Sequence, residues 1–359
     1  MRIQKLSITN LRNIKNAELH PGKGINIIQG SNGAGKTSVL ESIYLLARAR
    51  AMKTTQHKNL INHESDQLNI FSELCSDSNL ITRLGIRKDK KTTLVKQNGE
   101  VVRKLMDLAK ILPIATIAPN IQRIVEEGPV HRRKLLNWGL FHVEQQFGDL
   151  ISRYNQILKH RNALLGHRSQ DLSVWTKQLA ESGERIFELQ SGYLEMWKQE
   201  IESLCNCLPQ LQGLQLNIQK GWKRDLSLFE SLEQNYLTDE SRHFTSVGPH
   251  RLDIRITFNG HDIRNQFSRG QKKLVSIVLI LGQARLLQKV CLQCPILLID
   301  DLRAELDNST FITIINYINS LEYQTFLTSL DHEIIQEIVA MTSMMFHVEQ
   351  GHVSQDLSV

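Results

Sequence analysis

The chain has 359 residues, of which 41% are hydrophobic and 22% are charged, and its formal net charge is +6. These proportions exclude a disordered protein and are typical of a soluble globular chain with one large or two ordinary domains. The apolar runs, such as 275–281, are too short to span a bilayer, and the N-terminus lacks the apolar core of a signal peptide. Five cysteines without a regular framework favour a reducing cytoplasm. The positive charge permits nucleic-acid binding but does not by itself indicate it.

The first thirty residues alternate apolar and polar side chains. Ile3, Leu6 and Ile8 precede a turn, and a second apolar stretch follows at 25–29. This pattern predicts a short hairpin or sheet that leads into the next segment. Residues 38–47 are apolar at helical spacing, so a predicted strand and a predicted helix flank the segment between them.

That segment fits the phosphate-binding pattern G-x-x-x-x-G-K-[ST] completely. Its glycines let the backbone curl so that N–H groups point at phosphate oxygens, and the helix adds the positive end of its dipole. Lys36 would contact the β- and γ-phosphates, and the Thr37 hydroxyl would bind Mg²⁺. We therefore expect a nucleoside triphosphate site. Its predicted contact residues are Gly30, Ser31, Asn32, Gly33, Ala34, Gly35, Lys36, Thr37 and Ser38.

A β pattern extends from 68 to 105. Asn98-Gly99 is a strong hairpin signal within it. The basic run 87–91 indicates a tight turn, which is either solvated or a DNA contact. Residues 112–118 predict one more buried strand, which ends at Pro119.

Beyond Pro119 the composition changes to long helical segments with few glycines. Gly128-Pro129 is predicted to begin one helix, and 153–165 to belong to another. Over 172–196, apolar residues recur at alternating three- and four-residue steps. This heptad seam needs a partner helix, and an antiparallel helical arm is the expected arrangement.

Two short strings recur in the chain. Residues 141–145 are repeated at 346–350, and residues 169–174 at 354–359. The two offsets differ, so no common period links the strings, and we interpret the recurrence as coincidence.

Strand character returns at 252–258, and Asn259-Gly260 predicts a second hairpin after it. A strongly apolar helix then extends to Leu287. Ser268 is placed to cap this helix, which would leave N–H groups and the positive dipole end facing forward. A helix needs only a cap, so the wider motif indicates a further role. The motif consists of Ser268, Arg269, Gly270 and Gln271.

Residues 295–299 predict a buried strand that ends in Asp300 and Asp301. In a parallel sheet the carboxyl ends of strands meet at the ligand crevice, so both carboxylates are expected beside the phosphate loop. Asp300 would hold Mg²⁺, through water, and Asp301 would orient or deprotonate the attacking water. Residues 325–329 are expected to be the last core strand, with polar groups at its end.

In this order, the phosphate loop, the helical insertion, the Ser268 motif and the acidic strand end resemble an ABC-type ATPase head of the SMC and DNA-repair branch. The resemblance extends over essentially the whole chain to the RecF family of recombination mediators. It is carried by Leu11-Arg12-Asn13, Gly30 to Thr37, Leu40-Glu41, Arg50, Lys53, Gly128-Pro129, Arg132-Arg133, Trp138-Gly139, Arg161 to Leu165, Gly248 to Arg251, Ser268 to Gln271 and Ala304 to Asp307.

The resemblance implies an α/β fold, namely an ABC-type P-loop ATPase head with a mixed sheet around the phosphate loop and an inserted α-helical lobe. Lobe I, with the phosphate loop and the acidic strand, would comprise 1–118 and 291–359. Lobe II, with the helical arm and the Ser268 motif, would comprise 119–290.

The same resemblance implies a head-to-tail dimer that forms on ATP. Ser268 and Gly270 of one copy would contact the γ-phosphate held by Lys36 of the other, and Asp307 would lie across the same interface. Lys36, Asp300 and Asp301 would be catalytic, with Mg²⁺ held by Thr37 and Asp300. The nucleotide contacts would add Ser268, Arg269, Gly270, Gln271 and Asp307 to those of the phosphate loop.

The implied function is ATP-dependent binding to single-stranded DNA and to gapped or duplex junctions in the cytoplasm. The protein would be a weak DNA-stimulated ATPase that works with RecR and RecO to load RecA at gaps. It would act in DNA replication, repair and recombination and in the SOS response, without a membrane partner.

The chain also departs from the family pattern. Asp301 stands where transporters use Glu. The family also has Asp at this position, which fits slow turnover. Ser38 stands where the family usually has Asn, and Met52 where it usually has an aromatic residue. The residue of the Gln loop is not identified near 120–122, and the switch position lies among Thr328, Ser329 and His332.

Two other functions stay open at this point. One is the ATPase subunit of a transporter, against which the basic charge, the helical insertion and the family strings argue. The other is a structural DNA-binding module whose ATP site binds nucleotide without turnover.

Overall fold

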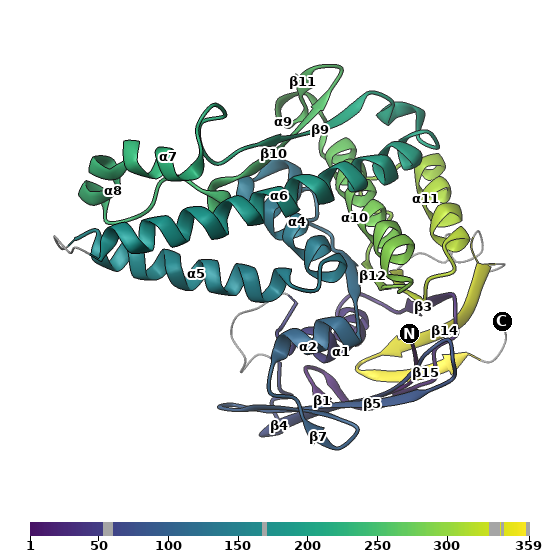
Figure 1. Cartoon of the computed structure of the whole chain (residues 1–359). Helices are drawn as coiled ribbons and strands as arrows, with labels where there is room; N and C mark the ends of the chain where they lie inside the picture. The colour runs from purple at the N-terminus through teal and green to yellow at the C-terminus, as the bar shows by residue number, and fades with distance from the viewer. Residues whose placement is uncertain (53–59, 167–170, 330–337, 339–340, 357–359) are drawn as a thin grey trace. The chain divides into compact units, whose positions relative to one another are not determined.

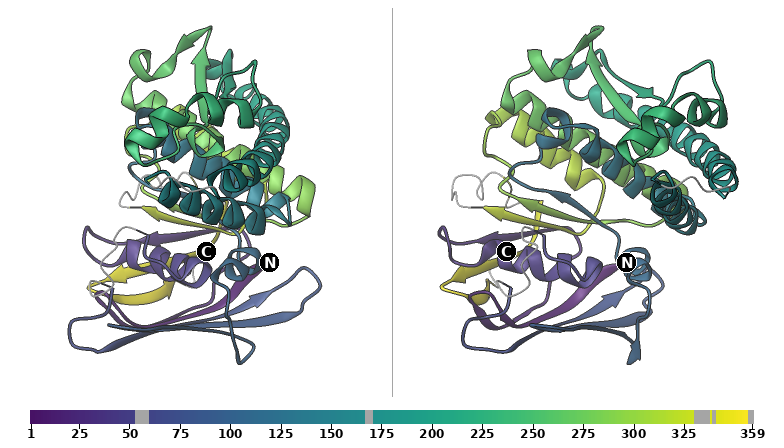
Figure 2. Two further views of the ribbon diagram at one scale, coloured as in Figure 1. Left: turned by 60° about the vertical axis from the view of Figure 1, so that its left-hand side comes forward. Right: turned by 90° about the vertical axis from the view of Figure 1, so that its left-hand side faces the viewer.

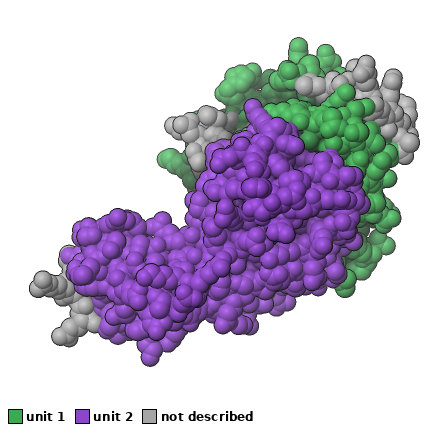
Figure 3. All heavy atoms as spheres, turned by 90° about the horizontal axis from the view of Figure 1, so that it is seen from above, with its two compact units in different colours: residues 1–121, 292–359 green, residues 122–291 purple. Residues whose placement is uncertain are grey.

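The computed structural model describes residues 1–52, 60–166, 171–329, 338 and 341–356. The chain forms two compact units, which Figure 3 distinguishes by colour. Unit 1 comprises residues 1–121 and 292–359, and unit 2 comprises residues 122–291. This division lies close to the predicted lobe boundaries, while the functions assigned to the two lobes stay predictions.

Unit 1 begins with a six-stranded antiparallel sheet in the order β2-β1-β4-β5-β6-β7. Ile3, Leu6 and Ile8 are all buried, although strict alternation would place Ile3 and Leu6 on opposite faces. The register of the first strand shifts between Ile3 and Lys5, and this bulge turns the three side chains to the same face. The strands are β1 (Arg2–Leu11), β2 (Ile14–Leu19), β4 (Gln67–Cys75), β5 (Ile81–Asp89), β6 (Thr93–Gln97) and β7 (Glu100–Val101).

The predicted hairpin at Asn98-Gly99 is confirmed. Strands β6 and β7 pair antiparallel across it, and the two residues have φ values of 49° and 93°. Positive φ at both central residues is typical of a type I′ turn, whose twist matches that of the flanking strands. The basic run at 87–91 is only partly a turn, because β5 continues to Asp89 and Lys88 is buried.

The second sheet of unit 1 has the order β15-β14-β3-β13-β12-β8. Strand β15 is antiparallel to β14, and the other neighbours are parallel. Strands β12 and β13 are buried throughout, as expected of parallel strands covered on both faces. The strands are β3 (Ile25–Gln29), β8 (Ile114–Ile117), β12 (Ile296–Asp300), β13 (Thr325–Ser329), β14 (Thr342–Glu349) and β15 (His352–Asp356).

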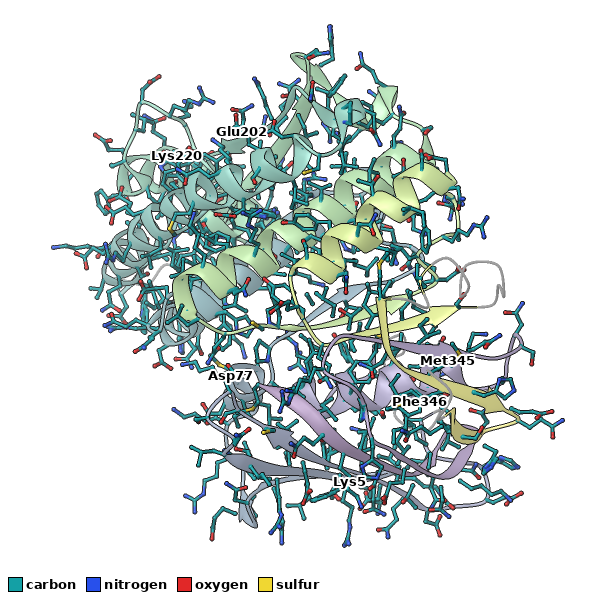
Figure 4. The ribbon with its side chains drawn as sticks, turned by 90° about the vertical axis from the view of Figure 1, so that its right-hand side faces the viewer. Lys5, Asp77, Glu202, Lys220, Met345 and Phe346 are labelled. Atoms are coloured by element: carbon teal, nitrogen blue, oxygen red, sulfur yellow. The ribbon has the colours of Figure 1, made fainter. Side chains whose placement is uncertain are left out.

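The prediction that 325–329 is the last core strand is wrong, because β14 and β15 follow it. Strand β14 places the fully buried Phe346 in the core (Figure 4). The sequence Phe-His-Val at 346–348 is extended, whereas the same three residues at 141–143 are helical. The string has no local preference strong enough to decide its structure, so the tertiary surroundings decide it.

Helix α1 (Lys36–Arg48) lies between the two sheets of unit 1 and contacts strands of both (Figures 1 and 2). Val39, Leu40 and Ile43 are fully buried, as is Glu41 among them. The helix is therefore the centre of the hydrophobic core, and its first turn follows the phosphate loop directly. Among the described residues, unit 1 also contains helices α2 (Leu105–Ile111) and α11 (Asn308–Ser320).

Unit 2 is mainly helical and contains a three-stranded antiparallel sheet in the order β11-β10-β9. The predicted hairpin at Asn259-Gly260 is confirmed, because β10 and β11 pair across it. The strands are β9 (Leu214–Gln219), β10 (Asp253–Phe258) and β11 (His261–Asp262). The helices are α3 (Arg123–Glu126), α4 (Pro129–Val143), α5 (Phe147–Leu164), α6 (Leu172–Cys205), α7 (Leu228–Gln234), α8 (Tyr236–Arg242), α9 (Ile263–Gln266) and α10 (Arg269–Cys291), with 3-10 turns at Pro209–Leu211 and Pro249–Arg251.

The predicted antiparallel helical arm is confirmed. Helices α5 and α6 lie side by side in Figures 1 and 2, and α6 has 34 residues. The predicted heptad seam describes only part of its buried face: Leu179, Ile186 and Tyr193 are buried, whereas Met196 is 37% exposed and Trp197 is buried instead. Helices α5 and α10 both pack against α6. The buried stripe of α6 is therefore that of a core helix with two neighbours, and wider than the seam of a two-helix coiled coil.

Helix α10 is long and apolar enough to cross a membrane, the one such helix in the part of the chain that the structure describes. Most of its apolar window is buried in the protein, and it contacts α4 and α6. It is therefore the core helix of unit 2.

Candidate nucleotide-binding site

The phosphate loop connects the end of β3 to the start of α1 in unit 1. At Gly30, a Cβ atom would come within 2.2 Å of the carbonyl oxygen of Val348. At Gly35, where φ is 122°, a Cβ would lie 3.0 Å from side-chain atoms of Asn13. Glycine is therefore required at both positions by the close approach of neighbouring strands and turns, in addition to any phosphate.

Lys36 folds back across the loop. Its Nζ donates hydrogen bonds to the carbonyl oxygens of Gly30, at 2.7 Å, and Ser31, at 2.9 Å. Burial lowers the pKa of Lys36 from its ordinary value, and the carboxylates of Asp300 and Asp301 act in the opposite direction. The ammonium group therefore stays within the loop, where the lysine of this motif meets phosphates.

Thr37 meets the end of β12. Its hydroxyl donates to the Asp300 carboxylate, with distances of 3.2 and 3.3 Å to the two oxygens. The Thr328 hydroxyl donates to Oδ1 of Asp300 at 2.9 Å from the neighbouring parallel strand. A hydroxyl and a carboxylate are hard oxygen donors, so this pair fits Mg²⁺ as a ligand set.

Asp301 follows directly and has a left-handed backbone, with φ 54°. Its N–H donates to the Thr328 hydroxyl at 3.1 Å. The residue is exposed and lines the same cleft as the phosphate loop. Asp tolerates this conformation better than most residues, because its short polar side chain can bond locally. The turn thus directs the chain away while the carboxylate remains at the cleft.

A cleft of about 520 Å³ in unit 1 brings the predicted catalytic residues Lys36, Asp300 and Asp301 together. Arg12, Asn13 and Pro119 also line it, and no role is predicted for them from the sequence. Arg12-Asn13 belongs to a string that carries the resemblance, but a turn residue far from the motif gives no chemical signal of its own. The other lining residues are Asn32, Gly33, Gly35, Thr37, Ser38, Thr328 and Ser329.

Arg12 forms an ion pair with Glu41, which is fully buried in α1. Glu41 also accepts a hydrogen bond from the backbone N–H of Met52 at 3.3 Å. The pair holds Arg12, whose φ is 52°, at the rim of the cleft. The ion pair thus fixes the position of the Arg12 side chain beside the phosphate loop.

The Ser268 motif lies in unit 2, at the start of α10. Oγ of Ser268 accepts from the N–H of Gln271 at 3.3 Å, and the Ser268 N–H donates to Oε1 of Gln271 at 2.9 Å. This reciprocal pair is a capping box, and the predicted cap is confirmed. Ser268, Arg269 and Gln271 are exposed, and Gly270 is half-buried.

Asp307 caps α11 in unit 1. Its carboxylate accepts from the Thr310 N–H at 2.8 Å and from the hydroxyls of Ser309 and Thr310. These bonds, with that of Ser309 first, lower the pKa of Asp307 to about 2. The side chain is thus fixed as an anion at the helix N-terminus, and its predicted contact with a second copy stays a prediction.

Other predicted positions are only partly located. Thr328 and Ser329 line the cleft, whereas His332 lies outside the described residues, as does Lys53. Ile121 and Gln122 are buried, which leaves the Gln-loop residue unassigned.

Comparisons with known proteins agree over the whole chain. Residues 2–354 match the family model described as RecF/RecN/SMC N terminal domain. The chain is 34% identical over 359 residues to the DNA replication and repair protein RecF of Vibrio atlanticus (strain LGP32), covering 99% of this chain and 100% of that protein. It is 36% identical over 358 residues to the protein of the same name from Chromohalobacter salexigens, covering 98% and 99%.

The fold is also similar to solved structures. The recombination mediator protein RecF-ATP in the RecFOR pathway matches with a TM-score of 0.87 and 24% identity, covering 99% of this chain and 97% of that one. The Smc head domain with an extended coiled coil from Pyrococcus furiosus matches with a TM-score of 0.59 and 15% identity, covering 99% and 96%. The chain therefore has the fold of these ATPase heads, as its sequence predicts.

Proposed function

The chain belongs to the RecF family, and on that premise we propose that it is an ATP-dependent DNA-binding protein of replication, gap repair and SOS induction. ATP would join two copies head to tail on DNA, and slow hydrolysis would release them. With RecR and RecO, the dimer would help to load RecA at gaps. The observation that carries the proposal is the contact between Thr37 of the phosphate loop and Asp300 of β12 in one cleft.

The nucleotide would lie with its phosphates in the loop 30–37. Lys36 would leave the carbonyls of Gly30 and Ser31 and take phosphate oxygens instead, since both are acceptors for the same ammonium group. Thr37 and Asp300 would hold Mg²⁺, which neutralises charge on the phosphates when it is bound. ATP and Mg²⁺ are the cofactors that this donor set favours.

Asp301 would orient or deprotonate the attacking water. Its carboxylate is exposed at the cleft, while its backbone N–H is bonded to Thr328. A side chain one methylene shorter than Glu reaches less far from the strand end, which agrees with slow turnover. The protein is therefore proposed to be a weak ATPase, stimulated by DNA.

The second half of the site would come from another copy. Ser268, with Gly270, would contact the γ-phosphate, and Asp307 would lie at the same interface. In support, the first residues of α10 are exposed, and the helix presents its positive dipole end there. Arg269 and Gln271 would complete the contact.

DNA is proposed to bind the ATP-joined dimer mainly through its phosphates. The net charge of +6 supports this. On the same premise we propose that the protein acts in the cytoplasm on single-stranded DNA and on gapped or duplex junctions. RecF membership and the burial of α10 argue against the transporter subunit that the sequence left open.

DNA binding across a salt series with ATP, ADP and a slowly hydrolysed ATP analogue tests the proposal. We expect tight binding with ATP and the analogue, weak binding with ADP, and a steep loss of affinity with salt. Equal affinity with all three nucleotides would overturn the ATP-gated clamp. Single-turnover hydrolysis by wild type and Asp301→Asn separates an ATPase from a module that binds without turnover, since the latter predicts no difference.

A further inference from the structure

Asn13, in the turn between β1 and β2, contacts three residues of the phosphate loop and of the first turn of α1. Its Nδ2 donates to the carbonyl oxygens of Ala34, at 2.7 Å, and Gly33, at 3.3 Å. Its Oδ1 accepts from the Ser38 hydroxyl at 3.2 Å. One amide therefore uses both its donor and its acceptor ends on the loop.

A second turn meets the same carbonyl. The backbone N–H of Gly351, between β14 and β15, donates to the oxygen of Ala34 at 2.8 Å. A Cβ at Gly351 would come within 2.0 Å of the carbonyl oxygen of Asn13, so the two turns pack backbone to backbone. With donors from Asn13 and Gly351, both lone pairs of the Ala34 oxygen are occupied.

The two hydrogen bonds to the Ala34 carbonyl oxygen set the direction of the Gly35 N–H. The Ala34–Gly35 peptide is planar and trans, so the Gly35 N–H points opposite to the Ala34 carbonyl. Gly35 lines the cleft and is the N-cap residue of α1, whose positive dipole end would face the phosphates. Anion binding by such a loop depends on the N–H directions being fixed in advance.

We propose that Asn13 is a positioning residue for nucleotide binding, which acts with the Gly351 turn to hold the phosphate loop in its anion-binding conformation. The proposal rests on the nucleotide site proposed above. Its effect falls on the phosphates that ADP and ATP share, because the loop cradles these. Both nucleotides therefore depend on Asn13 to the same degree, unlike a residue that senses only the γ-phosphate or the dimer.

Asn13→Asp is the sharpest test, because the variant keeps the shape of the side chain and replaces the amide donor by a carboxylate. That carboxylate would face two carbonyl oxygens, to which it can donate nothing. Asn13→Ala removes the side chain without adding charge. Asn10→Asp is the matched control: Asn10 also has positive φ, at 57°, but its amide bonds the Gln67 carbonyl instead of the loop.

Equilibrium binding of ADP and of ATP is measured for the full chain of each variant, with thermal unfolding in the absence of nucleotide. We expect Asn13→Asp to weaken both nucleotides by about tenfold or more and by the same factor, and Asn13→Ala by several-fold. Asn10→Asp is expected to change neither affinity by more than about twofold. Lower pH should reduce the difference in nucleotide affinity between Asn13→Asp and wild type, because protonation of the introduced carboxyl restores a donor.

Wild-type affinity in both Asn13 variants would overturn the positioning role, as would loss of ATP binding with ADP binding intact. A difference in affinity between Asn13→Asp and wild type that does not change with pH would contradict the donor function of the amide. If the wild-type chain binds neither nucleotide, the proposed nucleotide site itself fails, which is a different result from failure of Asn13 alone.

Discussion

The hydroxyl of Thr37 lies 3.2 Å from Oδ1 of Asp300, although 263 positions separate the two residues in the chain. Strands β3, β13 and β12 are parallel neighbours, so their carboxyl ends meet at one edge of the sheet. The loop after β3 supplies the hydroxyl, and the end of β12 supplies the carboxylate. Two distant segments thus build one oxygen ligand pair, as expected at the crevice of a parallel sheet.

Asp300→Asn should abolish most of the dependence of ATP binding on Mg²⁺. The amide keeps the hydrogen bonds to Thr37 and Thr328 within reach but removes the negative charge that attracts the cation. We expect ATP affinity with Mg²⁺ to fall by about tenfold or more, and affinity with excess chelator to stay near that of wild type. Asp77→Asn, at an exposed acid of unit 1 that does not line the cleft, is the control. Full Mg²⁺ dependence in Asp300→Asn would refute the ligand assignment.

Lys36→Ala should lose nearly all nucleotide binding. The side chain is the cation of the loop, and its partial burial there lowers its pKa. Removal of a charge-assisted contact to phosphates is expected to weaken ATP and ADP by about a hundredfold. Titration calorimetry with each nucleotide measures this, and a circular dichroism spectrum checks that the variant is folded. Binding within a few-fold of wild type would contradict the role of Lys36.

Ser268→Arg is expected to retain nucleotide binding and to lose the ATP-dependent dimer. The serine is exposed at the start of α10 in unit 2, where a long cation would block the approach of a second copy, whereas the phosphate loop belongs to unit 1. Sedimentation with ATP and with ADP measures the dimer. Ser227→Arg is a matched control, because Ser227 is also an exposed cap with a capping box, at α7. A normal ATP-dependent dimer in Ser268→Arg would rule out the contact across the interface.

The elements around the phosphate loop were predictable because their signals are local. The apolar runs of β3 and β12, and the Asn98-Gly99 turn, each determine their structure within a few residues. The parallel arrangement then follows from topology and places Asp300 beside Thr37 without further information. For this part of the site, a pattern and one rule of sheet geometry suffice.

Other features depend on contacts that no short pattern encodes. Asn13 acts through a turn that pairs with the Gly351 turn from the other end of the chain. Strand β14 was missed because its residues are also acceptable in a helix, as the copy at 141–143 demonstrates. The buried face of α6 was misplaced because α10, which covers it, follows a long way downstream. In each case the deciding partner is distant in sequence.

The stability of unit 2 should decrease as the pH is lowered, because of His250. Nε2 of this residue donates to the Thr245 carbonyl at 3.1 Å, and Nδ1 accepts from the Tyr154 hydroxyl at 2.7 Å, so both ring nitrogens are used by the neutral form. Burial, aided by the charges of Arg251 and Arg133, lowers the pKa of His250 from 6.5 to about 4, against the hydrogen bond to Thr245 and the charge of Asp239.

The sign follows from the lowered pKa. Above the unfolded pKa of 6.5, neither state is protonated and the residue makes its full contribution. As pH falls from there through the folded pKa of about 4, the unfolded state gains a proton first, and up to about 3 kcal/mol of stability is lost. All four tryptophans of the chain lie in unit 2, at 138, 175, 197 and 222, so their fluorescence reports its unfolding.

Denaturant unfolding from neutral to mildly acidic pH therefore compares wild type with His250→Gln, which cannot titrate. We expect the unfolding free energy of wild type to fall more steeply with decreasing pH than that of the variant. The difference in slope should correspond to about one extra proton bound by the unfolded state. His63→Gln, at an exposed histidine of unit 1, should keep the wild-type slope. Equal slopes in wild type and His250→Gln would mean that burial does not hold the ring neutral.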